Sequence, residues 1–323
     1  MNFRLALSTL MIVCSARMGV AEDVQLRAQA VAMMSRAKIA STLKGGPYNI
    51  ETDATFQTID RDGATVSGSL KRLRGSKGFL RQDVNWGDYR ASMIGVNMQI
   101  ATVGAWDAQP YAVRRLLALV PFSVGEFDAK DVVREIRDAA ASTCIVFETI
   151  EGESREPGDI CFAKETGAMI GAHAGGATYE YSGYHEIAGA LMPGHIGYRE
   201  RGGFSLSIDI AMTKLDPLPE GAFAFPAEVK VSTMCRRFSW PEPLSMPPPP
   251  VGGGDGTTVS HVNLQIEVNA EGMVTSARVV RSARPELNGE AVKTVQGWRY
   301  QPGICDGKAS PMTIEVTVPF QGR

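Results

Sequence analysis

The chain has 323 residues, of which 44% are hydrophobic and 21% are charged, a composition typical of globular proteins. Its 33 Lys and Arg residues and 35 Asp and Glu residues give a formal net charge of −2, which argues against a nucleic-acid-binding protein. The length predicts two domains of roughly 100–200 residues. Of its five cysteines, Cys14 lies in an N-terminal apolar run. The other four suffice for two disulfide bonds in an oxidising compartment.

The N-terminus has the pattern of an export signal. Leu5–Ala16 is an apolar run in the length range of a secretory signal. It is shorter than the roughly 20 residues of a membrane span, and Arg17 interrupts it. Small residues at 19–21 predict cleavage before Glu22, with residues 14–16 as a second candidate site. We therefore expect a signal peptide over 1–21 and a periplasmic protein. The alternative is an uncleaved segment that anchors the protein in the inner membrane.

The region after the signal is expected to contain one helix and then a meander of strands. Residues 22–43 carry apolar side chains at helical spacing, and Gly45-Gly46-Pro47 ends the pattern. Short segments between turn signals predict antiparallel strands. These segments are 52–60, 64–74, 78–84, 89–94 and 98–103. Helices are expected at 110–120 and 128–138.

Strands are predicted again after residue 138. Residues 142–150 and 159–164 flank a polar turn and predict a hairpin. Cys144 and Cys161 lie on its two arms, where a disulfide bond is geometrically reasonable and would staple a sheet edge. Further strands are expected at 177–183, 187–191, 194–199, 204–214 and 228–231. We therefore expect residues 22–239 to form a mostly antiparallel β domain with a few helices.

A Pro/Gly-rich segment at residues 240–256 marks a boundary. Four consecutive prolines favour an extended polyproline II conformation, and the glycines that follow them are flexible. This segment is expected to be a short linker to a small C-terminal domain at 257–323. The fold class is therefore α+β.

The C-terminal residues predict the order β-β-α-β. Apolar and polar residues alternate over 262–268, which indicates a strand with one buried face. Gly272 closes an Asn-Ala-Glu-Gly hairpin turn at the position that needs a positive φ. The partner strand is expected at 273–281, a helix from Pro285, and a last strand at 313–320. The helix would cover one face of a three-stranded sheet.

These residues resemble the C-terminal domain of the TonB family of energy-transducing proteins. The resemblance is carried by VNLQIEVNAEGMVTSARVVRSARPELNGEAVKTVQGWRYQPG at 262–303 and SPMTIEVTVPF at 310–320, and it covers about the last 65 residues. The motif residues that fall in the family's order are Gly272, Leu287, Trp298, Tyr300, Pro302 and Phe320. We interpret their roles as structural, with the two aromatic residues near 300 as core residues at the helix end.

The resemblance implies that the domain grips a short segment of an outer-membrane receptor. An exposed sheet edge can accept an extended peptide as an added strand. We expect the last strand to be this acceptor, with Thr313, Glu315 and Thr317 as the peptide-binding edge. The alternatives are that the edge stays solvated or pairs with itself in a dimer. The N-terminal apolar run and the Pro-rich segment are both shorter than those of a full energy transducer. This departure argues against energy transduction, and a true energy transducer stays open as a variant of the peptide-binding hypothesis.

Cys235 lies just before the Pro-rich segment, and Cys305 lies in the loop after the C-terminal helix. A disulfide bond between them would tie the start of the linker to the C-terminal domain. The alternative is that both are free thiols.

The central region also resembles the half-barrel of lipoprotein carriers of the LolA/LolB type, with a local match at NMQIATVGAWDAQP, residues 97–110. A half-barrel closed by helices would offer an apolar concavity for acyl chains or another hydrophobic ligand. Residues that would line this concavity, or alternatively fill a core, are Phe56, Leu80, Trp86, Met93, Met98, Ile100, Trp106, Leu116 and Leu119.

No catalytic motif is present in the sequence. There is no G-x-S-x-G elbow and no phosphate-binding loop, and no two of the four histidines have H-E-x-x-H spacing. His173, His185 and His195 would form a zinc site only if the fold gathered them. We therefore expect no catalytic residues, metal or cofactor. The first hypothesis is a non-enzymatic TonB-family envelope protein that binds a peptide of a receptor or another envelope protein. The second is a periplasmic carrier of a lipid or other hydrophobic ligand, and the third is an enzyme with an unrecognised site.

Overall fold

The computed structural model describes residues 5–44, 48–59, 63–128, 130–151, 154–249, 259–282 and 284–321, with side chains from residue 23 onward except at 151, 154, 259 and 321. The chain divides into two compact units. Unit 1 comprises Met1–Ser92 and Arg115–Ala222, and unit 2 comprises Met93–Arg114 and Phe223–Arg323. No helix in the described ranges is long and apolar enough to cross a membrane.

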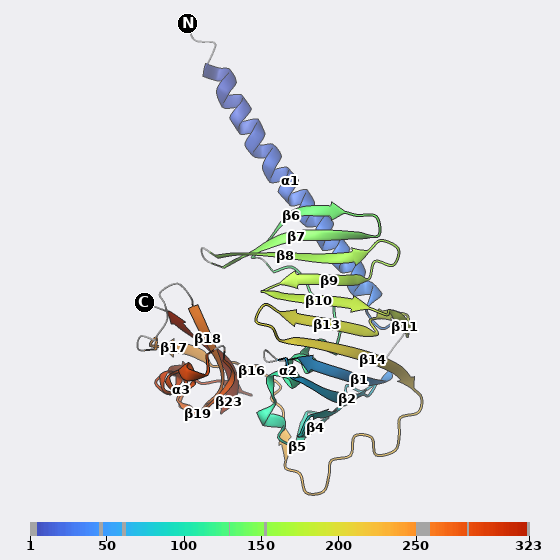
Figure 1. The fold of residues 1–323 in the computed structure, drawn as a ribbon, viewed down its shortest axis with the longest axis vertical. Helices are drawn as coiled ribbons and strands as arrows, with labels where there is room; N and C mark the ends of the chain where they lie inside the picture. Colours follow the sequence, from blue (N-terminus) through green and yellow to red (C-terminus); the bar gives the residue numbers. More distant parts are fainter. Residues whose placement is uncertain are drawn as a thin grey trace. The chain divides into compact units, whose positions relative to one another are not determined.

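Helix α1 (Leu5–Ala40) opens unit 1 (Figure 1). Its Ala30, Met34 and Ala37 recur at helical spacing and are at most 5% exposed. They pack in one apolar cluster with Ile145 and Phe162 from the sheet. The helix is therefore held to unit 1 by one apolar stripe.

The main part of unit 1 is an open antiparallel sheet with the order β3-β2-β1-β14-β13-β10-β9-β8-β7-β6. The order is mostly that of a meander, except where β1 pairs with β14 across more than a hundred residues of chain. Figure 1 shows these strands stacked in succession without closing into a barrel. The bounds are β1 (Asn49–Ile59), β2 (Thr65–Arg74), β3 (Leu80–Trp86), β6 (Asp131–Asp138), β7 (Ser142–Glu151), β8 (Ser154–Ala163), β9 (Met169–Ala174), β10 (Ala177–Ser182), β13 (His195–Glu200) and β14 (Ser205–Leu215).

Several expected elements of unit 1 and its neighbourhood differ in the structure. The second arm of the hairpin, expected at 159–164, begins already at Ser154. The helix predicted at 128–138 is wrong, because these residues form β6 from Asp131 and pair with β7. Pairing and burial at the sheet outweigh the local helical pattern. The strand predicted at 187–191 is a hairpin of β11 (His185–Ile187) and β12 (Ala190–Met192). The strand predicted at 228–231 is β15 (Val231–Thr233), which starts where the prediction ends.

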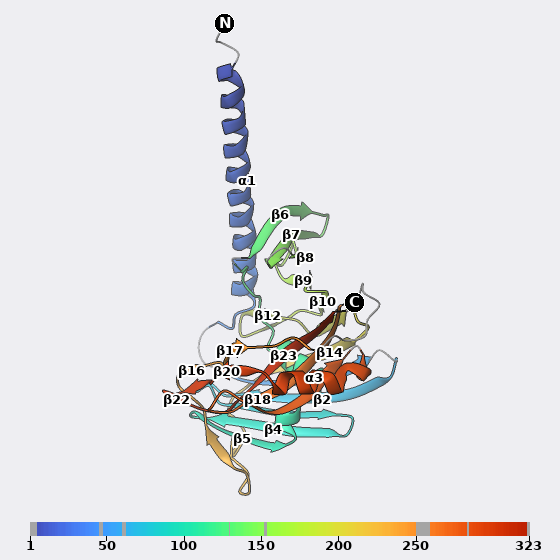
Figure 2. The same ribbon diagram turned by 90° about the vertical axis from the view of Figure 1, so that its left-hand side faces the viewer.

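The chain of unit 2 combines several short elements with a C-terminal three-stranded sheet. This sheet has the order β19-β18-β23 and carries α3 on one face (Figure 2). β4 (Tyr89–Val96) contains the division between the units, and β5 pairs with β15. The remaining bounds are β5 (Gln99–Gly104), η1 (Trp106–Ala108), α2 (Tyr111–Leu119), β16 (Phe238–Ser239), β17 (Glu242–Ser245), β18 (Val259–Val268), β19 (Val274–Ser282), η2 (Pro285–Leu287), α3 (Asn288–Gln296), β20 (Arg299–Gln301), β21 (Ile304–Cys305), β22 (Lys308–Ala309) and β23 (Met312–Gln321).

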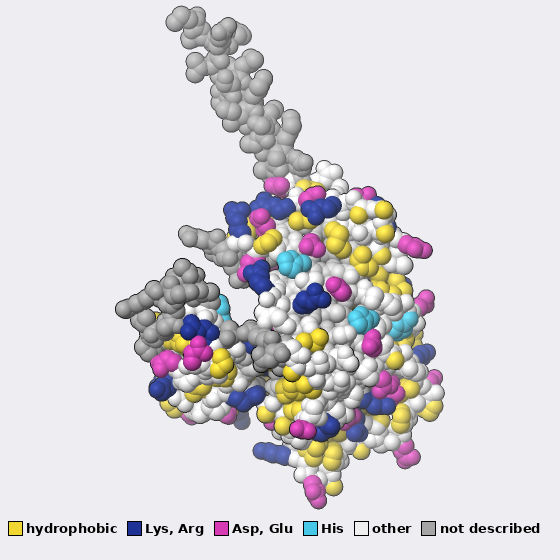
Figure 3. Space-filling view, in the orientation of Figure 1, with side chains coloured by type: hydrophobic (Ala, Val, Ile, Leu, Met, Phe, Trp, Pro, Cys, Tyr) yellow, Lys and Arg dark blue, Asp and Glu magenta, His cyan; other side chains and the backbone are white. Residues whose placement is uncertain are grey.

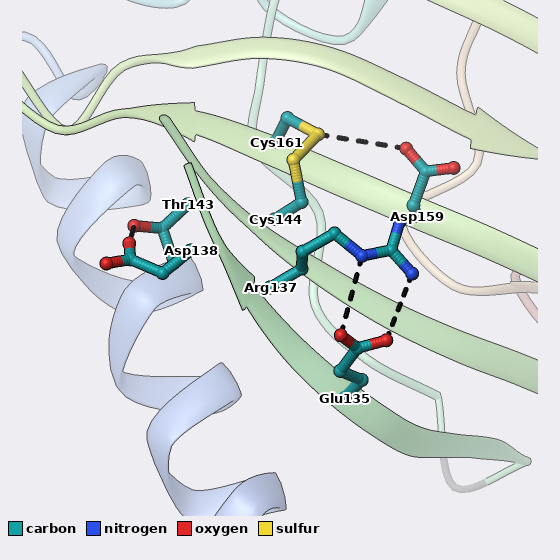
Figure 4. The surroundings of a disulfide bond; sticks show 7 residues. All are labelled: Glu135, Arg137, Asp138, Thr143, Cys144, Asp159 and Cys161. Atoms are coloured by element: carbon teal, nitrogen blue, oxygen red, sulfur yellow. Dashed lines mark hydrogen bonds and ion pairs between the residues drawn. A yellow bond between two sulfur atoms is a disulfide. The ribbon is translucent and has the colours of Figure 1, made fainter. Parts of the chain in front are cut away.

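A disulfide bond joins Cys144 and Cys161, which are directly paired residues of β7 and β8. Figure 4 shows the bond between the two strands, with the ion pair of Arg137 and Glu135 beside it on the neighbouring strand β6. The bond closes a loop with a sequence separation of 17 residues. It therefore restricts the unfolded chain near the β6 end of the sheet.

We expect the double substitution Cys144→Ser, Cys161→Ser to lower the free energy of unfolding of unit 1 by about 3 kcal/mol, the entropy that a loop of this size removes from the unfolded chain. The change in free energy is measured by unfolding in urea, with hydrogen exchange of the backbone amides of β7 and β8 as the readout. The matched control is Cys235→Ser, Cys305→Ser, which should leave exchange in β7 and β8 unaltered. Equal protection of these strands in the Cys144/Cys161 variant and the native chain would contradict the prediction.

Candidate functional site

The C-terminal module, residues 259–321, is built on the central strand β18. Its Val262, Leu264, Ile266 and Val268 are all fully buried. They form one core with α3 because their side chains alternate onto the same face of the sheet. The order β-β-α-β expected from the sequence is the order observed.

The motif residues of the module lie mainly in this core. Leu287, Trp298, Tyr300 and Phe320 are at most 8% exposed and belong to the cluster around β18. The Trp298 Nε1–H donates a hydrogen bond of 3.0 Å to the carbonyl oxygen of Pro247. Burial also raises the pKa of the Tyr300 hydroxyl. Burial in the core and the hydrogen bond of Trp298 indicate that these residues have structural roles.

Gly272 occupies a position that other residues cannot take without strain. Its φ is +78°, and a Cβ atom there would lie 1.8 Å from the carbonyl oxygen of Tyr300. The two backbones are this close because the Tyr300 N–H donates to the Gly272 carbonyl oxygen at 2.9 Å. The turn therefore fixes the start of β19 against β20.

Residues before the Pro/Gly-rich segment, and the first residues of that segment, also fold onto the module. β17 pairs with β20, and β16 pairs with β21. Cys235 and Cys305 form a disulfide bond, and the Asp306 carboxylate accepts hydrogen bonds from the backbone N–H groups of Arg236 and Arg237. The first residues of the segment expected to be a linker thus form a strand. The alternation of Phe238, Trp240 and Leu244 with smaller residues was the signal for it.

β23 is a regular edge strand of the module's sheet. It pairs with β18 without interruption from Met312 to Gln321, and no other described strand pairs with it. The opposite edge strand, β19, has register shifts at two points against β18. A straight edge is a better template for a further strand than a bulged one.

The three residues predicted for the peptide-binding edge lie together on one face of β23. Thr313, Glu315 and Thr317 are exposed and alternate with half-buried or buried apolar residues. The Thr317 hydroxyl donates a hydrogen bond of 3.2 Å to the Asn263 side chain. Glu315 forms an ion pair with Arg114 of α2. Both contacts are made by side-chain atoms of β23. They do not use the backbone N–H and C=O groups along its outer edge.

Pro319 indicates which backbone groups of β23 face outward. Proline within a sheet is placed where its missing N–H points away from the neighbouring strand. Residues two apart along an antiparallel strand direct their N–H groups to the same side. Thr313, Glu315 and Thr317 each lie an even number of residues before Pro319 in β23. Their N–H groups therefore face the outer edge, like the nitrogen of Pro319.

A cavity of about 250 Å³ lies in unit 1. It is lined mainly by apolar side chains from β1, β12, β14 and the segment after α2, together with two arginines of β2. None of the nine residues expected to line a concavity takes part. Phe56 and Leu116 are instead fully enclosed in the core at 2% and 0% exposure. The cavity residues are Leu43, Ile50, Thr52, Arg72, Arg74, Val120, Pro121, Phe122, Ser123, Met192, Pro193, Ile210 and Met212.

The histidines lie on separate strands. His173, His185, His195 and His261 belong to β9, β11, β13 and β18. The His195 Nδ1 atom lies 2.8 Å from the Asp209 carboxylate. Within the described ranges, no group of three or more His, Cys, Asp or Glu residues is placed to hold a metal ion. On the face that Figure 3 displays, basic and acidic side chains are interspersed over unit 1.

Residues 258–321 match the family model "Gram-negative bacterial TonB protein C-terminal". The C-terminal module is therefore similar to the TonB C-terminal domain. It accounts for about a fifth of the chain, and no curated protein matches the chain in sequence.

Several solved structures are similar to part of the chain. A LolA superfamily protein from Nitrosomonas europaea is 13% identical, with a TM-score of 0.39, and the match covers 60% of this chain and 96% of that one. A putative outer membrane lipoprotein-sorting protein domain from Vibrio parahaemolyticus is 10% identical, with a TM-score of 0.37 and coverage of 60% and 95%. MucB is 15% identical, with a TM-score of 0.32 and coverage of 84% and 98%. Scores this low assign no function to this chain.

The C-terminal module allows a sharp test of its turn. We expect Gly272→Ala to lower the free energy of unfolding of this domain by at least about 1–3 kcal/mol, because it adds backbone strain and a clash with Tyr300. Hydrogen exchange over residues 259–321 in urea measures the loss.

The matched control is Gly289→Ala in α3, where a Cβ atom meets nothing within 4 Å. Because alanine favours a helix over glycine, we expect this variant to stabilise the domain by about 0.5–1 kcal/mol. Equal effects of the two substitutions would refute the special role of Gly272.

Proposed function

We propose that this protein is a non-enzymatic interaction protein of the bacterial cell envelope that binds an extended peptide segment as an added strand along β23. The observation that carries the proposal is the uninterrupted edge strand within the TonB C-terminal domain. The proposed partner is a periplasmic segment of an outer-membrane receptor or another envelope protein. The N-terminal export pattern and the two disulfide bonds support a periplasmic location.

The proposed contact uses backbone groups for affinity and side chains for selection. A peptide strand paired with β23 would receive hydrogen bonds from the outward N–H groups of Thr313, Glu315 and Thr317. Pro319 offers no N–H, so the paired stretch would end there. A basic peptide residue opposite Glu315 would share this carboxylate with Arg114 and would add at most about 0.2–1 kcal/mol as a cross-strand pair. The peptide is therefore expected to be extended and to carry a basic residue near its centre.

We expect Glu315→Pro to weaken peptide binding at least about tenfold, because it removes one outward N–H and blocks close approach of a strand. The probes are synthetic peptides copied from the periplasmic segments of the outer-membrane receptors of the same bacterium. Fluorescence anisotropy with the full chain measures their Kd values.

The control is Glu315→Ala, which removes the same carboxylate but keeps the N–H. It should retain most of the affinity, with a loss limited to the side-chain charge of Glu315, which also pairs with Arg114. Unchanged binding by Glu315→Pro would refute strand addition at β23. Failure of every peptide to bind the native chain would refute the proposed partner class.

A second candidate function is favoured by the cavity of unit 1. Its lining is largely apolar, and its volume of about 250 Å³ lies just below the roughly 300–1,000 Å³ of typical ligand pockets. We propose carriage of a hydrophobic ligand as this alternative. Mass spectrometry of an organic extract from the purified full chain tests it, because a carried lipid would co-purify in stoichiometric amount. An extract without any bound lipid would count against it.

A further inference from the structure

The largely apolar cavity of unit 1 has positively charged side chains, those of Arg72 and Arg74, along one part of its wall. The strand register places Thr52 of β1 between Arg72 of β2 and Met212 of β14. In the next row on the same face, Ile50 lies between Arg74 and Lys214. Residues two apart on a strand share a face, so both arginines border the same space. The cavity lining includes both arginines and no Asp or Glu.

Arg72 has no acidic partner within the described part of the chain. It is half-buried, and no hydrogen bond or ion pair is formed by its guanidinium among those residues. Burial, and then the charge of Arg74, lower the pKa of Arg72. A partly desolvated cation without a counter-ion is costly, because buried charges are normally paired.

The neighbouring residue shows the usual arrangement on the opposite face of β2. The Lys71 Nζ atom lies 3.0 Å from a Glu51 carboxylate oxygen and 3.9 Å from an Asp53 oxygen. The same two strands thus supply acidic partners to a cation on one face and none on the other. The difference singles out the cavity face as a place where an external anion would complete the charge balance.

We propose that this cavity binds a single-chain anionic amphiphile, whose acyl chain occupies the apolar space while its anionic head pairs with Arg72 and Arg74. The inference rests on the second candidate function, carriage of a hydrophobic ligand, and adds the chemistry of the head group. A guanidinium matches a carboxylate or phosphate head through two parallel hydrogen bonds. The volume of about 250 Å³ suits one chain better than a lipid with several.

The apolar part of the cavity wall suits an acyl chain. Leu43, Phe122, Met192 and Met212 contribute aliphatic, aromatic and thioether surface. Phe122 also makes an edge-on contact with Tyr181, with the ring centroids 5.1 Å apart. Methionine side chains adapt to ligands of varied shape. The arrangement thus selects by charge at one side and tolerates different chains at the other.

The experiment compares cis-parinaric acid with its methyl ester, which has the same chain without the negative charge. Both are titrated by fluorescence into the delipidated full chain. We expect the acid to bind about tenfold or more tightly than the ester, the effect of one charge-assisted hydrogen-bonded pair.

Arg72→Gln should weaken binding of the acid about tenfold and leave that of the ester unchanged. Higher ionic strength should narrow the difference between acid and ester.

The matched control is Arg199→Gln on β13, an exposed strand arginine that does not line this cavity. It should leave both affinities unchanged, and circular dichroism verifies that both variants fold. Equal binding of acid and ester by the native chain would overturn the head-group inference and leave the carrier function standing. Equal loss of both ligands in Arg72→Gln would also overturn it, since it would indicate a packing role. Binding of neither ligand by the native chain would reject the inference and the carrier function together.

Discussion

Every strand of an open sheet needs a partner on each side, and the two outermost strands lack one. This constraint acts on both units, because neither sheet closes into a barrel. In the C-terminal sheet, β19 carries register shifts against β18, whereas β23 runs regularly along it. The edge that is left regular is the one proposed to receive a peptide, and it lies in the domain that matches the TonB family model.

The open sheet of unit 1 raises a different packing problem. One stripe of α1 is buried, and the β11–β12 hairpin adds a second apolar cluster against β1. The cavity borders the second cluster, with which it shares Ile50 and Met192, and its polar groups include two arginines without acidic partners in its lining. A sheet that was only structural would be expected to fill this space or pair these charges, as it does for Lys71 on the other face.

Local patterns predicted most of the elements that surround these two sites. Alternation identified β18 and β23, and helical spacing identified the buried stripe of α1, because side-chain period reports directly which face is buried. The same method failed at 128–138, where a short charged segment forms β6 through its pairing with β7. It also gave no account of the pairing of Arg72 with Thr52 and of Thr52 with Met212, which depends on register across distant strands.

The sequence by itself determined the β-β-α-β order of the C-terminal domain, its turn at Gly272 and the residues of its last strand. Those features depend on alternation, turn chemistry and motif, all of which are local. Only the tertiary structure decided that β23 is a regular edge, that residues before and at the start of the Pro/Gly-rich segment pair with the domain, and that the cavity is lined by residues other than those expected. The physical reason is that strand order, register and burial arise from contacts between residues far apart in the chain, which no local pattern records.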